Sequence, residues 1–538
     1  DGKTRINIAG KMSPLASLLL LLLLVLPGCE KKSPPQKAPE KAKPAWNGTG
    51  EGFRASRNDR KGIEINLKET KLAVIPEAYD KWGNITFSAD GRQVFYTARK
   101  KDRNFIVVAS MGGENIGPAY EGGSFLVKSP DGRRFAFGGK KRGKKHLVVD
   151  NKELKSLYHE EVAPSAFSPD GRFVVCEVGG LKEKKWFIVV SDGEKEVYRS
   201  RVYPDTYRQP VFSPDSRLLV YELGDDKRKI GSKKSTVFFL DVSTRKIIKE
   251  RLYTDYQTGK FSFSSDSSRV IYDVQKEGKT FLVLLNFALN EERKIELPYA
   301  SAGQFVLSPD GKKIVYAATK EGKYFLVISP WESPAQGKVG TTRPHPGGLA
   351  EESNRESGPY EGIRLIAFSP GPMPDATIAY HAMKRGKWRI VVGGKEGANY
   401  EGVGDATVFS PDAAKIAYPA MKDSGGGRQD RGMNGKWVMV VSPVGKPAAV
   451  RESPVYDMVV TPVFSPDGKY IAFRARTGTM EKAKRFLVIA NTETGKAIKE
   501  GHVSDEVWPP VWSADGKAVA YGARIGKELW WKVEKLDK

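Results

Sequence analysis

A short phrase, usually an aromatic residue followed by Ser, Pro, Asp and Gly, recurs along the whole chain. It is complete at residues 167–171 and 464–468. Ten variants occur, with the serine at Ser88, Ser129, Ser168, Ser213, Ser264, Ser308, Ser369, Ser410, Ser465 and Ser513. Successive serines are 39 to 61 residues apart. Internal repeats of roughly 40 to 50 residues are typical of propeller blades or of helical arrays.

The residues around the phrase favour blades over helices. Near Ser308, an apolar run at 304–307 precedes a Pro-Asp-Gly turn, and β-forming segments at 312–318 and 324–328 follow. Pro presets φ, Asp can bond its own backbone, and Gly supplies a positive φ. Two β-forming runs around a loop with glycine predict a hairpin. The units contain no stretch of 10 to 15 residues with helical periodicity.

Each unit has three clear strands and a weaker fourth, such as 397–401, which predicts a four-stranded propeller blade. The third strands are nearly continuous apolar runs, as expected when both faces of a sheet are buried. We therefore predict an all-β fold, a β-propeller of about ten four-stranded blades over residues 62–538.

The two ends of the repeat region suggest how the propeller closes. Strand-like segments at 63–67 and 72–75 precede the first phrase, and the last unit, 511–533, has only three strands. Pairing between these ends would close one ring and remove the exposed sheet edges. One ring is favoured. The alternative is two smaller propellers, with the boundary in the Pro- and Gly-rich segment 331–359.

The repeated phrase and the β-forming residues after it resemble the blades of the TolB-like, WD-repeat-like β-propeller family, over about residues 62–535. Two units depart from the pattern: residues 264–267 lack both Pro and Gly, and an insertion separates Ser369 from Asp375. The resemblance implies a periplasmic interaction platform. It implies little about chemistry, because the matching residues form turns and cores.

The N-terminal region is interpreted as a targeting segment. Residues 15–26 are a twelve-residue apolar run, which fits a signal-peptide core and is shorter than the roughly 20 residues needed to span a bilayer. The following Pro27-Gly28-Cys29 resembles a bacterial lipobox, with Pro27 as a departure, and implies lipidation of Cys29. An ordinary cleaved signal with an incidental cysteine is the alternative. Residues 1–28 are thus a predicted lipoprotein signal peptide, with Met12 as its start and residues 1–11 outside the native protein.

Residues 29–61 are rich in Lys and Pro and predict a disordered tether. Its basic residues would add attraction to an anionic membrane surface. The predicted location is the bacterial cell envelope, facing the periplasm or the exterior, with the membrane contacted through lipid on Cys29 and through the tether.

The formal net charge of +24 raises the question of nucleic acid. The lysines, however, fall mainly in loops between strands all around the repeat, and an export signal takes the protein away from the nucleoid. We therefore expect no nucleic-acid partner. Anionic lipid, an anionic envelope polymer or an acidic protein are the expected partners, with simple solubilising charge as the alternative. Cys176 lies in a predicted strand and is expected to be a buried thiol.

No catalytic, cofactor or metal residue is assigned from the sequence. There is no G-x-S-x-G motif, and His146, His159, His345, His381 and His502 are scattered without metal-ligand spacing. The repeated aspartates offer one carboxylate per turn, so a turn role is favoured over calcium binding. Trp508, Trp512, Trp530 and Trp531 are expected to pack at the closing blade.

The preferred function is a non-catalytic, lipid-anchored scaffold or sensor that binds an envelope protein of unknown identity. One alternative is an enzyme or ligand-binding propeller that acts on polysaccharide, lactone or peptide at the central channel. The other is a protein that binds an anionic envelope polymer. A contiguous basic face would favour the polymer, an exposed apolar patch would favour a protein, and converging His, Asp and Glu side chains would favour an enzyme.

Overall fold

The computed structural model describes residues 53–55, 64–123, 126–180, 185–225, 234–331, 355–370, 376–423, 435–479 and 482–536. Within these ranges the regular structure is entirely β and forms ten sheets. None of the described segments forms a helix that could cross a membrane. The predicted signal peptide, Cys29 and nearly all of the predicted tether lie outside the described residues.

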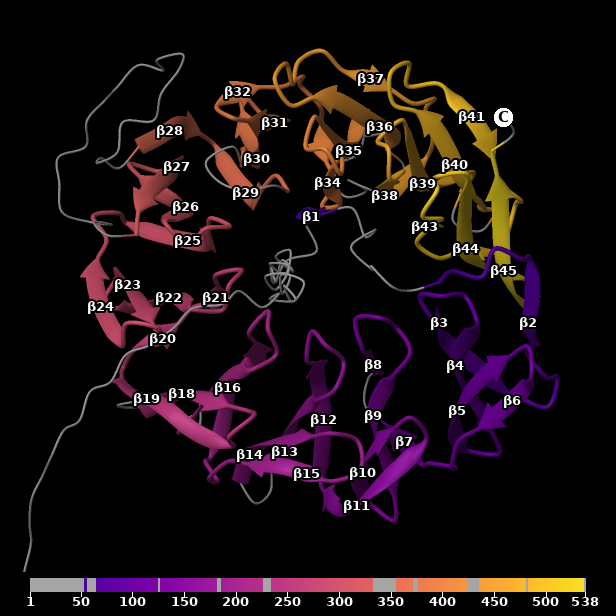
Figure 1. Ribbon diagram of the computed structural model, residues 1–538, viewed down its shortest axis with the longest axis horizontal. Helices are drawn as coiled ribbons and strands as arrows, with labels where there is room; N and C mark the ends of the chain where they lie inside the picture. The colour runs from indigo at the N-terminus through magenta and orange to yellow at the C-terminus, as the bar shows by residue number, and fades with distance from the viewer. Residues whose placement is uncertain are drawn as a thin grey trace, which may run out of the picture. The chain divides into compact units, whose positions relative to one another are not determined.

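Figure 1 shows the ten sheets as blades around one ring. The prediction of a single ten-bladed propeller is confirmed, and the alternative of two propellers is wrong. The predicted boundary at 331–359 does not separate two propellers, because β27 (Lys323–Pro330) and β28 (Arg355–Tyr360) pair within one blade. In blades 1 to 9 the strands follow chain order from the centre outward, and in blade 10 the outermost strand is β2, from before the first blade. We name the four positions A, B, C and D from the centre outward.

Blades 1 to 5 are built as follows: β3 (Lys81–Phe87), β4 (Gln93–Lys100), β5 (Arg103–Ser110) and β6 (Gly113–Ile116); β7 (Gly122–Gly123) with β8 (Val127–Lys128), β9 (Phe135–Lys141), β10 (Lys144–Val149) and β11 (Lys152–His159); β12 (Glu161–Phe167), β13 (Val174–Gly180), β14 (Lys185–Ser191) and β15 (Glu196–Arg199); β16 (Asp205–Phe212), β17 (Leu218–Gly224), β18 (Lys234–Asp241) and β19 (Lys246–Thr254); β20 (Gln257–Thr258) with β21 (Ser262–Phe263), β22 (Arg269–Lys276), β23 (Lys279–Asn286) and β24 (Glu291–Glu296).

Blades 6 to 10 follow in the same order: β25 (Ser301–Leu307), β26 (Lys313–Lys320), β27 and β28; β29 (Gly362–Phe368), β30 (Ile378–Lys384), β31 (Lys387–Val392) and β32 (Lys395–Glu396); β33 (Gly402–Val403) with β34 (Thr407–Phe409), β35 (Lys415–Asp423), β36 (Lys436–Pro443) and β37 (Arg451–Glu452); β38 (Met458–Phe464), β39 (Tyr470–Thr477), β40 (Lys484–Asn491) and β41 (Ala497–Glu500); β42 (Glu506–Val507) with β43 (Val511–Trp512), β44 (Ala518–Ile525), β45 (Glu528–Lys535) and β2 (Thr70–Val74). A short strand, β1 (Phe53–Ala55), pairs in parallel with β34.

The ring closes by pairing its two ends, as predicted. Strand β2, from before the first phrase, is strand D of blade 10 and lies antiparallel to β45. The Trp531 indole on β45 donates to the Asn66 carbonyl oxygen at 2.8 Å and adds a second link. The predicted strand at 63–67 is wrong for its described part, because residues 64–67 have no strand partner there. The chain reaches β2 through this segment without adding a further strand.

The core consists of layers between neighbouring blades. One layer joins Val175, Ile188 and Val190 of blade 3 to Phe212 and Leu219 of blade 4, and all five are buried. Because every blade is covered on both faces, its central strands are buried over most of their length, and their buried residues are mostly apolar, as the third-strand pattern predicted. The fourth strand of blade 7 is shifted from the prediction of 397–401 to β32, because a tight turn at Gly393 and Gly394, both with positive φ, brings the chain back at once.

The repeated phrase forms the turn between strands A and B. In blade 3, the Ser168 hydroxyl donates to Asp170 Oδ1 at 2.6 Å, and the Phe173 N–H donates to the Ser168 hydroxyl oxygen at 2.9 Å. Asp170 Oδ1 also accepts the Arg172 N–H, and Gly171 has a φ of 73°. The same Ser–Asp bond occurs in eight other units, including residues 264–267. A turn role for these aspartates is therefore confirmed.

Turns of neighbouring blades touch one another. Where serine replaces the glycine, at Ser216 and Ser267, its hydroxyl accepts the backbone N–H of the aspartate in the preceding blade. The Arg134 guanidinium donates to the Gly171 carbonyl oxygen of the next blade at 3.1 Å. The A–B turns therefore lie together on one face, which we call the turn face. The opposite face carries the B–C hairpins and the D–A connections, and we call it the hairpin face.

The innermost strands are interrupted four residues before the phrase serine. In blades 1, 6, 7 and 9 the residue there has a positive φ and lies in a β-bulge: Asn84, Gln304, Leu365 and Thr461. In blades 5, 8 and 10 strand A divides into two short strands at this point. Bulges bend a strand and re-aim its side chains, so each inner strand bends where it lines the centre of the ring.

Candidate functional site

The residues considered for chemistry in the sequence do not converge. Cys29, the predicted lipidation site, and His345 lie outside the described residues. His381 is buried in β30, with its Nε2 atom 2.8 Å from the Thr407 hydroxyl of the next blade. Burial, together with the Arg364 charge, lowers the pKa of His381 to about 3, so this histidine is neutral at physiological pH. Among the described residues, no group of three or more His, Cys, Asp and Glu could hold a metal ion.

Cys176 is a free, fully buried cysteine, as predicted. Burial raises the pKa of its thiol, which keeps the thiol protonated and unreactive. It packs in the apolar layer between blades 2 and 3.

The hairpin face collects basic side chains from every blade. Each of the ten B–C hairpins has lysine or arginine in its described turn or at its strand ends. They are Lys100, Lys101 and Arg103; Lys141, Arg142 and Lys144; Lys185; Lys234; Lys276 and Lys279; Lys320 and Lys323; Lys384, Arg385 and Lys387; Lys422 and Lys436; Lys482 and Lys484; and Lys527.

Five of these hairpins place two basic residues directly opposite each other on either side of a two-residue turn. The pairs are Lys100–Arg103, Lys141–Lys144, Lys276–Lys279, Lys320–Lys323 and Lys384–Lys387. Each pair flanks a two-residue turn in which both residues have positive φ, the geometry that fits the twist of a hairpin. The two-residue turn fixes the register of strands B and C, so the two like charges stay opposite each other. Like charges opposite each other destabilise a sheet.

Carboxylates on the same face hold the hairpin turns. Glu361 accepts the N–H groups of Arg385 at 2.8 Å and Gly386 at 2.9 Å, and these bonds lower the pKa of Glu361. Asp80, Glu121, Asp457 and Asp505 accept turn N–H groups in the same way in their own blades. All five stand eight residues before a phrase serine, a repeat that sequence reasoning missed and that counting back from the phrase would have found.

These carboxylates leave the hairpin face with mixed charge. Lys387 pairs with Glu401, and Lys436 pairs with Asp457 at 2.7 Å. Lys320 and Lys323 are exposed, and neither takes part in an ion pair with a described residue. The hairpin face therefore carries mixed charge, with cations and fixed carboxylates side by side, rather than a uniform basic surface.

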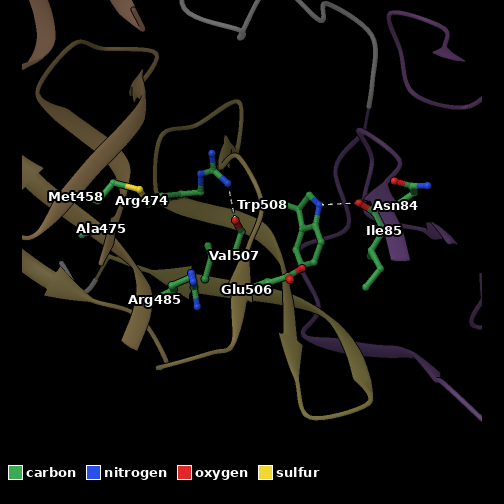
Figure 2. Close-up of a pocket in the computed structure, with 9 residues that line it drawn as sticks. All are labelled: Asn84, Ile85, Met458, Arg474, Ala475, Arg485, Glu506, Val507 and Trp508. Atoms are coloured by element: carbon green, nitrogen blue, oxygen red, sulfur yellow. Dashed lines mark hydrogen bonds between the residues drawn. The ribbon is translucent and has the colours of Figure 1, made fainter. Parts of the chain in front are cut away.

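A cavity of about 380 Å³ opens toward the hairpin face where blades 9, 10 and 1 meet (Figure 2). The interruptions of three inner strands build it. The bulge of blade 1 contributes Asn84, the break in blade 10 contributes Trp508, and Thr461 in the bulge of blade 9 binds the lining residue Arg474. Apolar wall is provided by Ile85, Met458, Ala475 and Val507.

The tryptophans of the closing blade have different roles. Trp512 and Trp531 are each 2% exposed and pack in the core, as predicted. Trp508 is half-buried and lines the cavity, so packing alone is not its role. Its indole N–H donates to the Ile85 carbonyl oxygen at 2.9 Å, which holds the ring across the junction of blades 10 and 1 (Figure 2).

Several exposed apolar side chains of the described residues lie on the outermost strands. Ile116, Ile248 and Ile498 are exposed on strand D of blades 1, 4 and 9 and are thus distributed around the outside of the ring. The distinctive surface of the described residues is therefore the mixed, lysine-rich hairpin face with its cavity.

Comparisons with known proteins find only remote likeness. No protein-family model and no curated protein sequence matches the chain. A crystal structure of a eukaryotic initiation factor is similar over 77% of this chain and 96% of its own, with 13% identity and a TM-score of 0.43. The Dos1 propeller aligns over 77% of this chain and 92% of its own, with 11% identity and a TM-score of 0.36.

TolB from Acinetobacter baumannii aligns over 59% of this chain and 81% of its own, with 15% identity and a TM-score of 0.24. At these scores the likeness carries no argument about function. The fold rests on the strand pairing, and the function rests on the site.

Proposed function

We propose that this chain is a non-catalytic scaffold of the bacterial cell envelope that holds an acidic protein against its hairpin face. The observation that carries this proposal is the presence of lysine or arginine on all ten B–C hairpins, which share one face. A charged face of this kind steers a partner of opposite charge and fixes its orientation.

The like-charge pairs support a role in binding. A hairpin such as β26–β27 would be more stable with opposite charges across it than with Lys320 opposite Lys323. In three of the five hairpins the chain's own carboxylates pair with a lysine, as in Lys141–Glu153, Lys279–Glu296 and Lys384–Glu396. The cost is unrelieved at Lys100–Arg103 and Lys320–Lys323, for which no ion pair with a described residue is present. Carboxylates of a partner would relieve the repulsion, so part of the binding free energy would come from the strained hairpins.

The mixed charge favours a protein over a polymer. A polyanion binds best to a uniform basic field, whereas this face has fixed carboxylates such as Glu361 and Asp457 between its lysines. A folded acidic partner can present a complementary pattern. An anionic envelope polymer is the second candidate, supported by the ring of lysines. The described residues offer no converging set of histidines and carboxylates to support an enzyme.

The envelope location is part of the proposal and is supported by the sequence. The apolar run ending at Cys29 and the Lys- and Pro-rich residues after it fit a lipid anchor with a tether. Thirty residues of flexible tether have an r.m.s. reach of about 30 Å, enough to present the propeller above the headgroups.

Affinity capture from envelope membranes tests the proposal. The tagged native protein is expected to recover an acidic envelope protein, and the capture is expected to weaken between about 50 mM and 500 mM salt. The Cys29→Ser chain should leave the membrane fraction and still bind the partner in solution. Recovery of polysaccharide without protein would replace the scaffold by the polymer candidate, and turnover of a glycan, lactone or peptide would contradict both.

A further inference from the structure

Arg474 is a cation held inside the ring without a counter-charge among the described residues. It lies on β39, next to the buried Phe473. Its Nε–H donates to the Thr461 hydroxyl oxygen at 2.8 Å, and an Nη1–H donates to the Val507 carbonyl oxygen at 2.7 Å. Both acceptors are neutral. Burial lowers the pKa of Arg474 to about 10, and no described carboxylate offsets that cost.

The two hydrogen bonds fix the plane of this guanidinium. They use two of its five N–H donors and leave the rest, including both on Nη2, for a ligand. Figure 2 shows Arg474 reaching toward Val507 at the wall of the cavity. A guanidinium with a fixed plane and free donors binds an oxyanion bidentately at little entropic cost.

Arg485 supplies a second cation to the same cavity from β40. An Nη1–H donates to the Asp505 carbonyl oxygen at 2.8 Å, and none of the described ion pairs involves this arginine. It stands directly opposite Arg476 in the sheet, another like-charge pair on the hairpin face. The lining carboxylate, Glu506, is shared with Arg524 at 3.4 Å. The cavity therefore has a surplus of positive charge.

The rest of the lining selects among anions. Trp508, Ile85, Val507 and Met458 provide an apolar wall next to the arginines, which suits a short carbon chain that ends in a carboxylate. A phosphate has no chain to cover that wall.

We infer that the cavity between blades 9, 10 and 1 binds a carboxylate on a short aliphatic chain, with Arg474 and Arg485 as the binding residues and Trp508 as the wall. This inference rests on the proposed function in one respect: the carboxylate belongs to a side chain or terminus of the acidic partner. The cavity thus provides the specific anchor within a face that otherwise attracts the partner by charge.

Titration of the full-length protein with butanoate, followed by saturation-transfer NMR, tests the inference. Butanoate is expected to saturate a single site in the millimolar range. The neutral isostere butanamide, and inorganic phosphate followed by its displacement of butanoate, are expected to bind at least about tenfold more weakly. Arg474→Gln should abolish butanoate binding. Because Arg474 is also tied to two neighbouring strands, Arg485→Gln is the decisive variant and should weaken binding by about tenfold or more.

Arg451→Gln, on the exposed strand D of blade 8, is the matched control and should bind butanoate like the native protein. Equal binding of butanamide, tighter binding of phosphate, or unchanged binding by Arg485→Gln would overturn the inference. The Lys100→Glu/Lys320→Glu protein distinguishes the scaffold proposal from the carboxylate-site inference, because the two changes alter the charge of the hairpin face and leave the cavity residues unchanged. Partner capture that persists without butanoate binding contradicts the anchor alone, and butanoate binding without any captured partner contradicts the scaffold alone.

Discussion

At the residue scale, the fold depends on one hydroxyl in each blade. The Ser168 hydroxyl is fully buried, accepts the Phe173 N–H and donates to Asp170. Burial alone would raise the pKa of Asp170, but hydrogen bonds from Ser168 and from the Arg172 backbone and side chain lower it. The repeat therefore preserves a small hydrogen-bonded unit that closes each turn and touches the next one. This part of the molecule was readable from the sequence, because Ser, Pro, Asp and Gly each have a local backbone role.

Ser168→Ala should destabilise the protein by about 1–3 kcal/mol, because the part-buried Phe173 N–H loses its acceptor. Urea unfolding measures this loss of stability. The control is Ser301→Ala, at an exposed serine on β25, which should lower the free energy of unfolding by only a few tenths of a kcal/mol. The lowered pKa of Asp170 stabilises the folded protein at pH values above 3.8, the ordinary pKa of the carboxyl in the unfolded chain. This stabilisation is lost as the pH falls below that value and Asp170 becomes protonated. The difference between native and Ser168→Ala proteins should therefore shrink in acid. Equal costs for the two serines would contradict the role of the hydroxyl.

At the scale of the element, the sequence predicted hairpins and blades but not where the strands bend. Leu365 and Thr461 have positive φ in the inner strands, a conformation that these residue types do not signal. The cavity was also out of reach of sequence reasoning, because Asn84, Arg474 and Trp508 are brought together only when the ring closes. The excess of lysine in the loops was visible in the sequence. Its concentration on one face was not, because it results from the alternating strand direction, which places all B–C loops on the same side of the ring.

Lys323→Glu should stabilise the protein while weakening its binding. The change turns a like-charge pair with Lys320 into an opposite pair, worth roughly 0.2–1 kcal/mol across a hairpin. Chemical unfolding measures the gain. Lys312→Glu, the same change at an exposed site in the turn face, should not stabilise the chain. A loss of stability in Lys323→Glu would show that the lysine pair is not under strain.

At the scale of the whole molecule, stability depends on the pairing of β2 with β45. Without β2, strand β45 would be an open edge of blade 10 and a template for aggregation. The sequence predicted this closure from a spare strand at one end and a missing strand at the other. The sequence could not show that blades 9, 10 and 1 form a cavity where they meet, because the cavity depends on where the inner strands are interrupted.

Leu72→Ala on β2 should cost about 2–5 kcal/mol, because Leu72 is 4% exposed and packs in the layer between blades 10 and 1. Val74→Ala, at a position 50% exposed on the same strand, should cost far less. The urea midpoints of the two variants give the comparison. Similar midpoints would mean that the closing strand adds little to the ring.

We propose that the hairpin face, and not basic charge in general, binds the partner. The most direct measurement compares how much captured envelope protein is retained by Lys100→Glu/Lys320→Glu and by Lys312→Glu/Lys517→Glu. Both variants change the net charge equally, the first on the hairpin face and the second on the turn face, and all four lysines are exposed. We expect the first variant to lose the partner and the second to keep it. Equal retention, or loss in the turn-face variant alone, would contradict it.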